Sequence, residues 1–223
     1  MTTMRNVVLA NDCVYHVYNR GVGRVPIFTD RREFARGVET LKFYRYSNKN
    51  LRLSKFLELS NEEKARELTS ISKIDNKLVE LIAYSLMPNH FHLLIKQLQD
   101  NGISRFLSNF TNSYTKYFNT RHGRIGPLVQ GIFKASLIET NEQFIHVSRY
   151  IHINPVVSLV VKEKDLESYE WSSLRSYLGL EEGFVDKESV ISNFPSEYQY
   201  KQFIYDHIDY AKQLESIKHL IQE

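Results

Sequence analysis

Apolar residues recur along the chain in two spacings, one typical of strands and one typical of helices. Near the N-terminus, over residues 13–19, Val and Tyr alternate with other residues, which predicts a strand. Further short apolar runs predict three more strands. We expect the four strands at residues 13–19, 78–85, 90–96 and 133–139. Apolar residues three or four positions apart predict amphipathic helices at residues 30–47 and 103–120.

The order of these elements is strand, helix, two strands, helix, strand. This is the ferredoxin-like split pattern, so we expect an α+β fold with an antiparallel sheet of four to five strands and helices on one face. A further helix over residues 141–154 follows the last strand as an addition. After Gly179 a linker at 181–185 precedes a C-terminal helix predicted over residues 196–222.

His90 and His92 lie in the third predicted strand with Phe91 between them. Side chains of a strand alternate between its two faces, so both imidazoles should project side by side while Phe91 points into a core. A polar pair on an apolar strand costs free energy unless both rings are satisfied, and a metal ion would satisfy them. The alternative is two histidines that each have an ordinary hydrogen-bond partner.

A second segment favours the metal site. Tyr150 and Asn154 are four positions apart near the end of the helix predicted over residues 141–154, so they share one helix face. The carboxamide of Asn154 would add a third ligand, an oxygen, to the two imidazoles around the metal ion. The phenol of Tyr150 beside them would be a nucleophile. Two nitrogens and one oxygen with open positions suit Mg²⁺ or Mn²⁺ when phosphate and water complete the set.

Five segments resemble one known family, in the order in which that family carries them. They are residues 15–21, 88–92, 131–135, 149–156 and 169–179. Together they resemble the Y1 transposases of the HUH endonuclease superfamily, in particular the REP-associated tyrosine transposases, which are related to the IS200/IS605 transposases. The likeness covers most of residues 13–180.

The resemblance implies the HUH endonuclease fold in a catalytic domain over residues 1–180, with residues 49–77 as a helical insertion and residues 181–223 as a C-terminal helical extension. It also implies that Tyr150 attacks a phosphodiester in single-stranded DNA, forms a 5′-phosphotyrosine link and releases a 3′-OH. The expected DNA carries hairpins or repeats. A monomer is favoured over a homodimer, because the branch with a C-terminal extension resembles a monomer that completes its own site.

Two other functions are open to the same sequence. One is a catalytically silent DNA-binding regulator on the same fold, and the other is a replication initiator or relaxase-like nickase. The joint presence of His90, His92, Tyr150 and Asn154 argues for the transposase, because a regulator would not need all four.

The net charge of +3 hides an uneven distribution along the chain. Residues 1–60 carry +6 and residues 101–140 carry +4, whereas residues 141–223 carry −6. Basic charge therefore concentrates around the histidine pair, as in surfaces that bind nucleic-acid phosphates, although a solvated basic surface is the alternative. The residues that we expect to contact DNA are Arg20, Arg121, Arg124, Lys134 and Arg149.

The composition sets the remaining expectations. An apolar content of 42% is enough for a sizeable core. The chain has one cysteine, Cys13, so an internal disulfide is excluded, which suits a reducing cytoplasm. No apolar run reaches the roughly 18 residues of a membrane span, so we expect a cytoplasmic protein without membrane contact.

Overall fold

A four-stranded antiparallel sheet lies at the centre of the computed structural model, which describes residues 7–47, 51–72 and 77–213. The strands are β1 (Val14–Arg20), β2 (Val79–Met87), β3 (His90–Gln97) and β4 (Lys134–Ile138). Their order across the sheet is β2-β3-β1-β4, and every neighbouring pair is antiparallel. This is the ferredoxin-like arrangement, so the predicted α+β fold class is confirmed.

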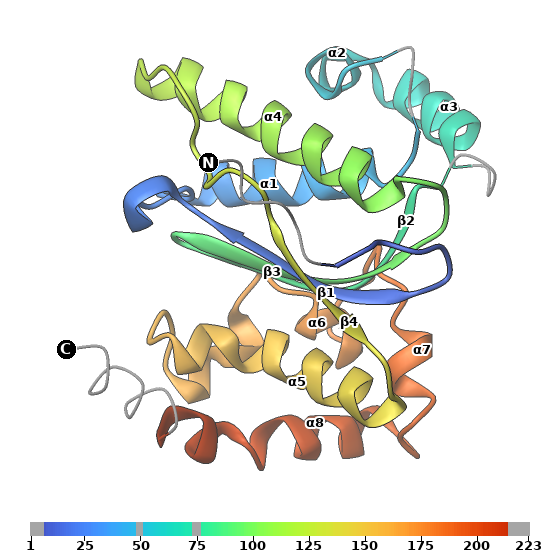
Figure 1. Ribbon diagram of the computed structural model, residues 1–223, viewed down its shortest axis with the longest axis vertical. Helices are drawn as coiled ribbons and strands as arrows, with labels where there is room; N and C mark the ends of the chain where they lie inside the picture. The colour runs from blue at the N-terminus through green and yellow to red at the C-terminus, as the bar shows by residue number, and fades with distance from the viewer. Residues whose placement is uncertain (1–6, 48–50, 73–76, 214–223) are drawn as a thin grey trace.

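Helices cover both faces of the sheet (Figure 1). The two helices of the split pattern, α1 (Arg31–Tyr44) and α4 (Gly102–His122), lie on one face, as expected. On the opposite face lies α5 (Asn141–Val157), with α8 (Glu197–Tyr205) outside it. The expectation of helices on one face therefore holds only for the split pattern itself. Nearly all of β2 is buried, and a strand buried on both faces needs cover on both sides.

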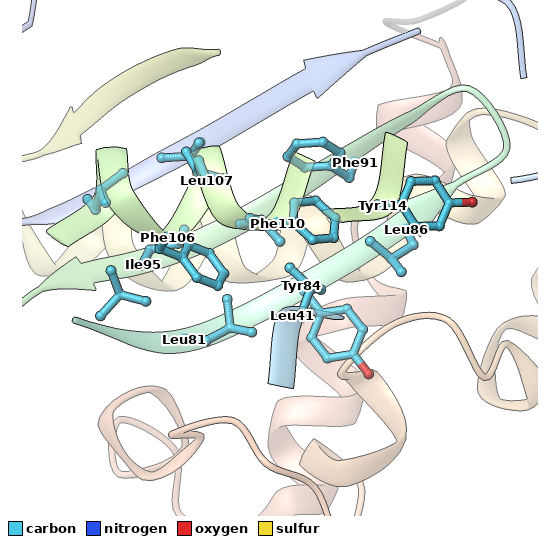
Figure 2. Packing of buried hydrophobic residues seen from close by; sticks show 14 of the residues in the cluster. Leu41, Leu81, Tyr84, Leu86, Phe91, Ile95, Phe106, Leu107, Phe110 and Tyr114 are labelled. Atoms are coloured by element: carbon cyan, nitrogen blue, oxygen red, sulfur yellow. The ribbon is translucent and has the colours of Figure 1, made fainter. Parts of the chain in front are cut away.

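The main core lies between the sheet and the pair α1 and α4 (Figure 2). Phe106, Phe110 and Tyr114 follow one another at four-residue spacing along α4 and form its buried stripe. Phe91 points from β3 into this core and meets the ring of Phe110 edge to face, at 5.2 Å between centroids. As the alternation rule predicts, Phe91 therefore faces away from the side that carries His90 and His92.

Two short helices lie within the stretch predicted as an insertion. They are α2 (Leu53–Glu58) and α3 (Asn61–Ile71), and α3 begins with a capping box formed by Ser60 and Glu63. Phe56 and Ile71 pack on Phe43 near the end of α1, so a separate small apolar cluster attaches both helices. This agrees with the prediction that the stretch is helical. The view of this stretch as an insertion stays a prediction.

A second core joins α5 to the sheet and to the C-terminal elements. These elements are a 3-10 helix (Glu163–Ser168), α6 (Leu174–Tyr177), α7 (Glu188–Ile191) and α8. Tyr200 and Ile204 of α8 are fully buried in this core. The helix predicted over residues 196–222 stops at Tyr205, and helix resumes over residues 208–213; its last residues lie outside the described part. The domain boundary after residue 180 stays a prediction.

The hairpin between β2 and β3 has a two-residue turn at Pro88 and Asn89. The carbonyl of Pro88 accepts hydrogen bonds from the backbone amides of Ile27 and Phe28, and that of Asn89 accepts one from Gly21. The turn is thus held by the loop that follows β1, and it fixes the start of β3 at His90.

None of the helices in the described part of the chain is both long enough and apolar enough to span a bilayer.

We predict that Phe110→Ala destabilises the protein by about 3–5 kcal/mol, because it leaves a cavity where the ring meets Phe91. Urea unfolding would measure this change. Ile125→Ala is the matched control, because Ile125 is 94% exposed and its removal should change the free energy of unfolding by less than about 0.5 kcal/mol. An equal loss in both variants would contradict the assignment of Phe110 to the core.

Candidate active site

Strand register gathers polar side chains on the face of the sheet that α5 covers. Tyr18 of β1 pairs with His92 of β3, and Arg20 pairs with His90. On the other side of β1, Tyr18 also pairs with Lys134 of β4. Because paired residues of neighbouring strands share a face, these side chains lie together although they come from three separate segments.

His90 is held between two asparagine side chains. Its Nδ1 is 2.6 Å from Asn89 Oδ1, and its Nε2 is 3.4 Å from Asn154 Oδ1. The Asn89 amide nitrogen donates to the carbonyl of Arg24, which turns its oxygen toward His90. If His90 Nδ1 donates to that oxygen, the lone pair of Nε2 faces a second oxygen, Asn154 Oδ1. A cation between these two atoms would remove their repulsion.

His92 lies deeper and contacts a third histidine, His16. His92 is 6% exposed, and its Nδ1 is 2.9 Å from His16 Nε2. Burial, with smaller contributions from His16 and His90, holds the pKa of His92 well below its usual value. Burial also lowers the pKa of His16 to about 4. Both rings are therefore neutral at pH 7, as a metal ligand must be.

Tyr150 and Asn154 reach this cluster from α5. The ring of Tyr150 meets His92 and His16 edge to face, at 5.4 Å and 5.7 Å between centroids. Tyr150 is 41% exposed, whereas Asn154 is buried and its Oδ1 also accepts a hydrogen bond from Ser158. The structure therefore brings together the four residues singled out in the sequence, with the phenol accessible, His92 and Asn154 buried, and His90 partly buried.

The donor set fits a small divalent cation. Two ligands bound at right angles to Mg²⁺, each at about 2.1 Å, stand about 3 Å apart, close to the 3.4 Å between His90 Nε2 and Asn154 Oδ1. Within the described residues no three His, Cys, Asp or Glu side chains form a metal-binding group. The fit therefore depends on the mixed set of His90, His92 and the Asn154 amide.

The five basic residues expected to contact DNA are not all near the site. Arg20 and Lys134 are exposed and lie on strands beside the histidines. Arg121 forms ion pairs with Asp30 and Glu33 at the other face of the sheet, and Arg124, just after α4, donates to the side chain of Asn119 near the end of that helix. Arg149 is buried, with its guanidinium 4.0 Å from the ring centroid of Phe203.

Arg149 and His152 instead tie α5 to its surroundings. Arg149 also donates to the carbonyl of Phe203 on α8. His152 is fully buried, and its two ring nitrogens are each 2.8 Å from a hydroxyl, that of Tyr200 and that of Ser173. These contacts hold the helix from the side opposite the site, so Tyr150 and Asn154 are fixed in place.

Sequence reasoning did not find the roles of Asn89 and His16. Asn89 is adjacent to His90 and to Pro88, so an asparagine that caps the turn and orients the next side chain could have been inferred. His16 carried no local signal, because only the pairing of β1 with β3 brings it to His92.

A cavity of about 350 Å³ lies elsewhere, between α1, β2 and the segment that follows residue 170. Aromatic residues and four glutamates line it, namely Tyr84, Trp171, Phe184, Glu39, Glu170, Glu181 and Glu182. None of the candidate site residues contributes to it. Its acidic wall is unsuited to DNA phosphate, so the histidine cluster remains the candidate site.

The chain resembles transposases in sequence and in fold. The sequence model of the family described as "Transposase IS200 like" matches residues 52–154. Among solved structures the chain is similar to that of a REP-associated tyrosine transposase bound to a REP hairpin, with 17% identity and a TM-score of 0.51. That match covers 82% of this chain and 89% of the other. No curated protein matches the chain.

These findings identify the chain first as a protein with the fold of the tyrosine transposases. The family match then shows that the sequence of residues 52–154 is similar to that of the IS200-like transposases. The resemblance drawn from the five sequence segments is therefore confirmed. The matched span includes His90, His92, Tyr150 and Asn154, and it ends at Asn154.

We predict that the free energy of unfolding falls as the pH is lowered from 6.5 toward 3. The pKa of folded His152 is lowered from 6.5 to about 3 by burial, so in this window the unfolded chain binds a proton that the folded protein does not. Above pH 6.5 neither state binds that proton, and the stability is fully present.

His152→Gln should reduce this slope by up to about 1.4 kcal/mol per pH unit, the contribution of one proton. Urea unfolding at pH values between 4 and 6 would measure the slope. Between pH 7 and 8 the variant and the original protein should show the same slope. An unchanged slope below pH 6 would show that His152 is protonated in the folded state.

Proposed function

We propose that the protein is a metal-dependent single-strand DNA endonuclease and strand transferase in which Tyr150 is the nucleophile. The observation that carries this proposal is the position of the Tyr150 ring, 5.4 Å from His92 and accessible to solvent. His90 and Asn154 lie beside it as the other ligand candidates. A phenol, two imidazoles and an amide oxygen at one spot support phosphodiester transfer to tyrosine.

Mg²⁺ or Mn²⁺ would be held by His90, His92 and the Asn154 amide oxygen. When bound there, the cation would supply Lewis-acid polarisation and orientation of the scissile phosphate. His90 fits this role because the Asn89 oxygen beside its Nδ1 favours the tautomer that carries its hydrogen there, which leaves the lone pair of Nε2 for the cation.

The transfer itself needs few protein groups. The Tyr150 oxygen bonds to phosphorus and loses its proton to water, while the bond from phosphorus to the 3′ oxygen breaks and that oxygen takes up a proton. The product is a 5′-phosphotyrosine and a free 3′-OH, so the energy of the phosphodiester is kept for a later rejoining step. A free phenol has a pKa near 10, so it needs nearby positive charge to react at pH 7.

The DNA partner that we propose is a single strand that carries a hairpin. The related structure contains a REP hairpin, which supports this class of substrate. In this chain Arg20 and Lys134 are exposed on the site face and are suited to hold phosphates of the bound strand. Such a role fits the cytoplasm, where DNA is reached without membrane passage.

A catalytically silent DNA-binding regulator is the second candidate function. The basic residues near the site would bind DNA in a regulator as well as in an endonuclease. A regulator, however, has no need for a histidine pair and an amide oxygen beside an accessible phenol. A covalent link between protein and DNA separates the two functions.

We predict that hairpin-bearing single-stranded DNA with Mn²⁺ yields a protein–DNA adduct that survives a denaturing gel. Tyr150→Phe should abolish the adduct, at least 100-fold, because the nucleophilic oxygen is gone, while binding of the hairpin in a gel shift is kept. A chelator should abolish the adduct of the unchanged protein as well.

Tyr198→Phe is the matched control, because Tyr198 is 65% exposed on α8 and outside the site. It should form the adduct at the original rate. An adduct that persists in Tyr150→Phe would assign the chemistry to another residue, and no adduct in the unchanged protein would favour the regulator.

We propose that the protein works as a monomer, because one chain supplies Tyr150 to its own histidines. A mixture of Tyr150→Phe and His90→Ala should therefore form no adduct, since neither chain holds a complete site. Adduct in the mixture, read on the same denaturing gel, would show that two chains share a site and that the active form is a dimer.

A further inference from the structure

His16 lies in the site but has no role in the function proposed above. It comes from β1, and its ring lies nearly parallel to that of His92, at 5.1 Å between centroids and 21° between planes. The Nε2 atom of His16 is 2.9 Å from Nδ1 of His92, which is hydrogen-bond distance. The rings of His16 and Tyr150 also meet edge to face, at 5.7 Å between centroids.

This contact decides which ring nitrogen of His92 carries no hydrogen. A neutral imidazole has one N–H and one lone pair, so one of the two rings must donate. If His92 donates from Nδ1, its Nε2 keeps a lone pair for a cation. If His16 donates from Nε2, then His92 carries its hydrogen on Nε2 and binds no cation there.

Resting on the proposed function, we propose that His16 is a positioning residue that accepts the hydrogen of His92 Nδ1 and so presents His92 Nε2 to the metal. His16 then carries its own hydrogen on Nδ1. His16 fixes both the tautomer and the ring orientation of His92 and contacts neither the metal nor DNA.

The second histidine ligand has the same arrangement, which supports the assignment. Behind His90, the oxygen of Asn89 stands 2.6 Å from Nδ1, and that oxygen is an acceptor. Each of the two ligand candidates thus has an acceptor placed at Nδ1 by a neighbouring residue. Ligand histidines in metal sites are generally oriented in this way.

The fold holds His16 in place. Tyr18 pairs with His92, and His16 is two residues before Tyr18, so it lies on the same face one step along β1. The ring of Tyr18 lies 5.2 Å from that of His16 and 5.6 Å from that of His92. His16 is therefore packed against the ligand from one side and against Tyr150 from another.

The test is calorimetric titration of the full chain with Mn²⁺ alone, in the absence of DNA. His16→Phe keeps a flat ring of similar size but has no acceptor, so the Mn²⁺ dissociation constant should rise about 10–100-fold. His16→Gln places a carbonyl oxygen near the same point and should recover most of the affinity. His207→Phe, the same change at a ring packed on Tyr210 outside the site, should leave the affinity unchanged.

Comparison with His90→Ala separates the failure of this inference from the failure of the proposed function. If the original protein and His90→Ala bind Mn²⁺ equally, the metal site is absent and both proposals fall. If His90→Ala loses affinity while His16→Phe matches the original protein, only the role of His16 falls. Circular dichroism of each variant shows whether the fold is kept.

A measurement on the unchanged protein covers the case in which His16→Phe does not fold. Long-range ¹H–¹⁵N NMR spectra with saturating Mg²⁺ report which nitrogen of each histidine carries hydrogen. We expect hydrogen on Nδ1 of His92 and on Nδ1 of His16. Hydrogen on Nε2 of His92 would overturn the assignment.

Discussion

The packing of α5 on the sheet is the interaction on which the candidate site depends. His90 and His92 come from β3, whereas Tyr150 and Asn154 come from a helix that begins more than 40 residues later in the chain. Apolar contacts of Ile151 and Ile153 join this helix to the second core. The hydrogen bonds of His152 to two buried hydroxyls add direction to that packing, because they are satisfied at one orientation of the helix.

The two faces of β3 carry different kinds of side chain. Phe91, Leu93 and Ile95 enter the main core under α4, and that core holds the sheet in shape. The opposite face carries His90 and His92 and needs polar partners. Because the larger apolar core lies on the other side, the polar face can be filled with imidazoles, amides and phenols while the fold keeps most of its buried apolar surface.

What could be predicted from the sequence was set by local periodicity. Alternation along β3 placed His90 and His92 together, and four-residue spacing along α5 placed Tyr150 and Asn154 together. The order of the elements gave the sheet topology. The structure brings the two pairs to one place, although which ligands bind and which residue attacks remain proposals.

What could not be predicted depends on partners distant in sequence. His16 meets His92 through strand pairing across 76 residues. From the sequence alone, Arg121 is available to bind phosphate. In the structure it forms ion pairs with Asp30 and Glu33 at the start of α1. Arg149 looked close to the nucleophile, but Phe203 of α8 covers it. Local spacing holds no information about such contacts, so charge counts along the chain overstated the number of cations near the site.

Tyr150 lies at the surface and β4 is an edge strand whose side chains are mostly exposed. The phenol of Tyr150 is therefore open from the flank of the molecule, not enclosed at the bottom of a tunnel. A polymer can be laid against it sideways anywhere along its length. If Tyr150 attacks DNA as proposed, the groups that anchor the strand nearby would decide where it is cut, and no free end of the strand would be needed.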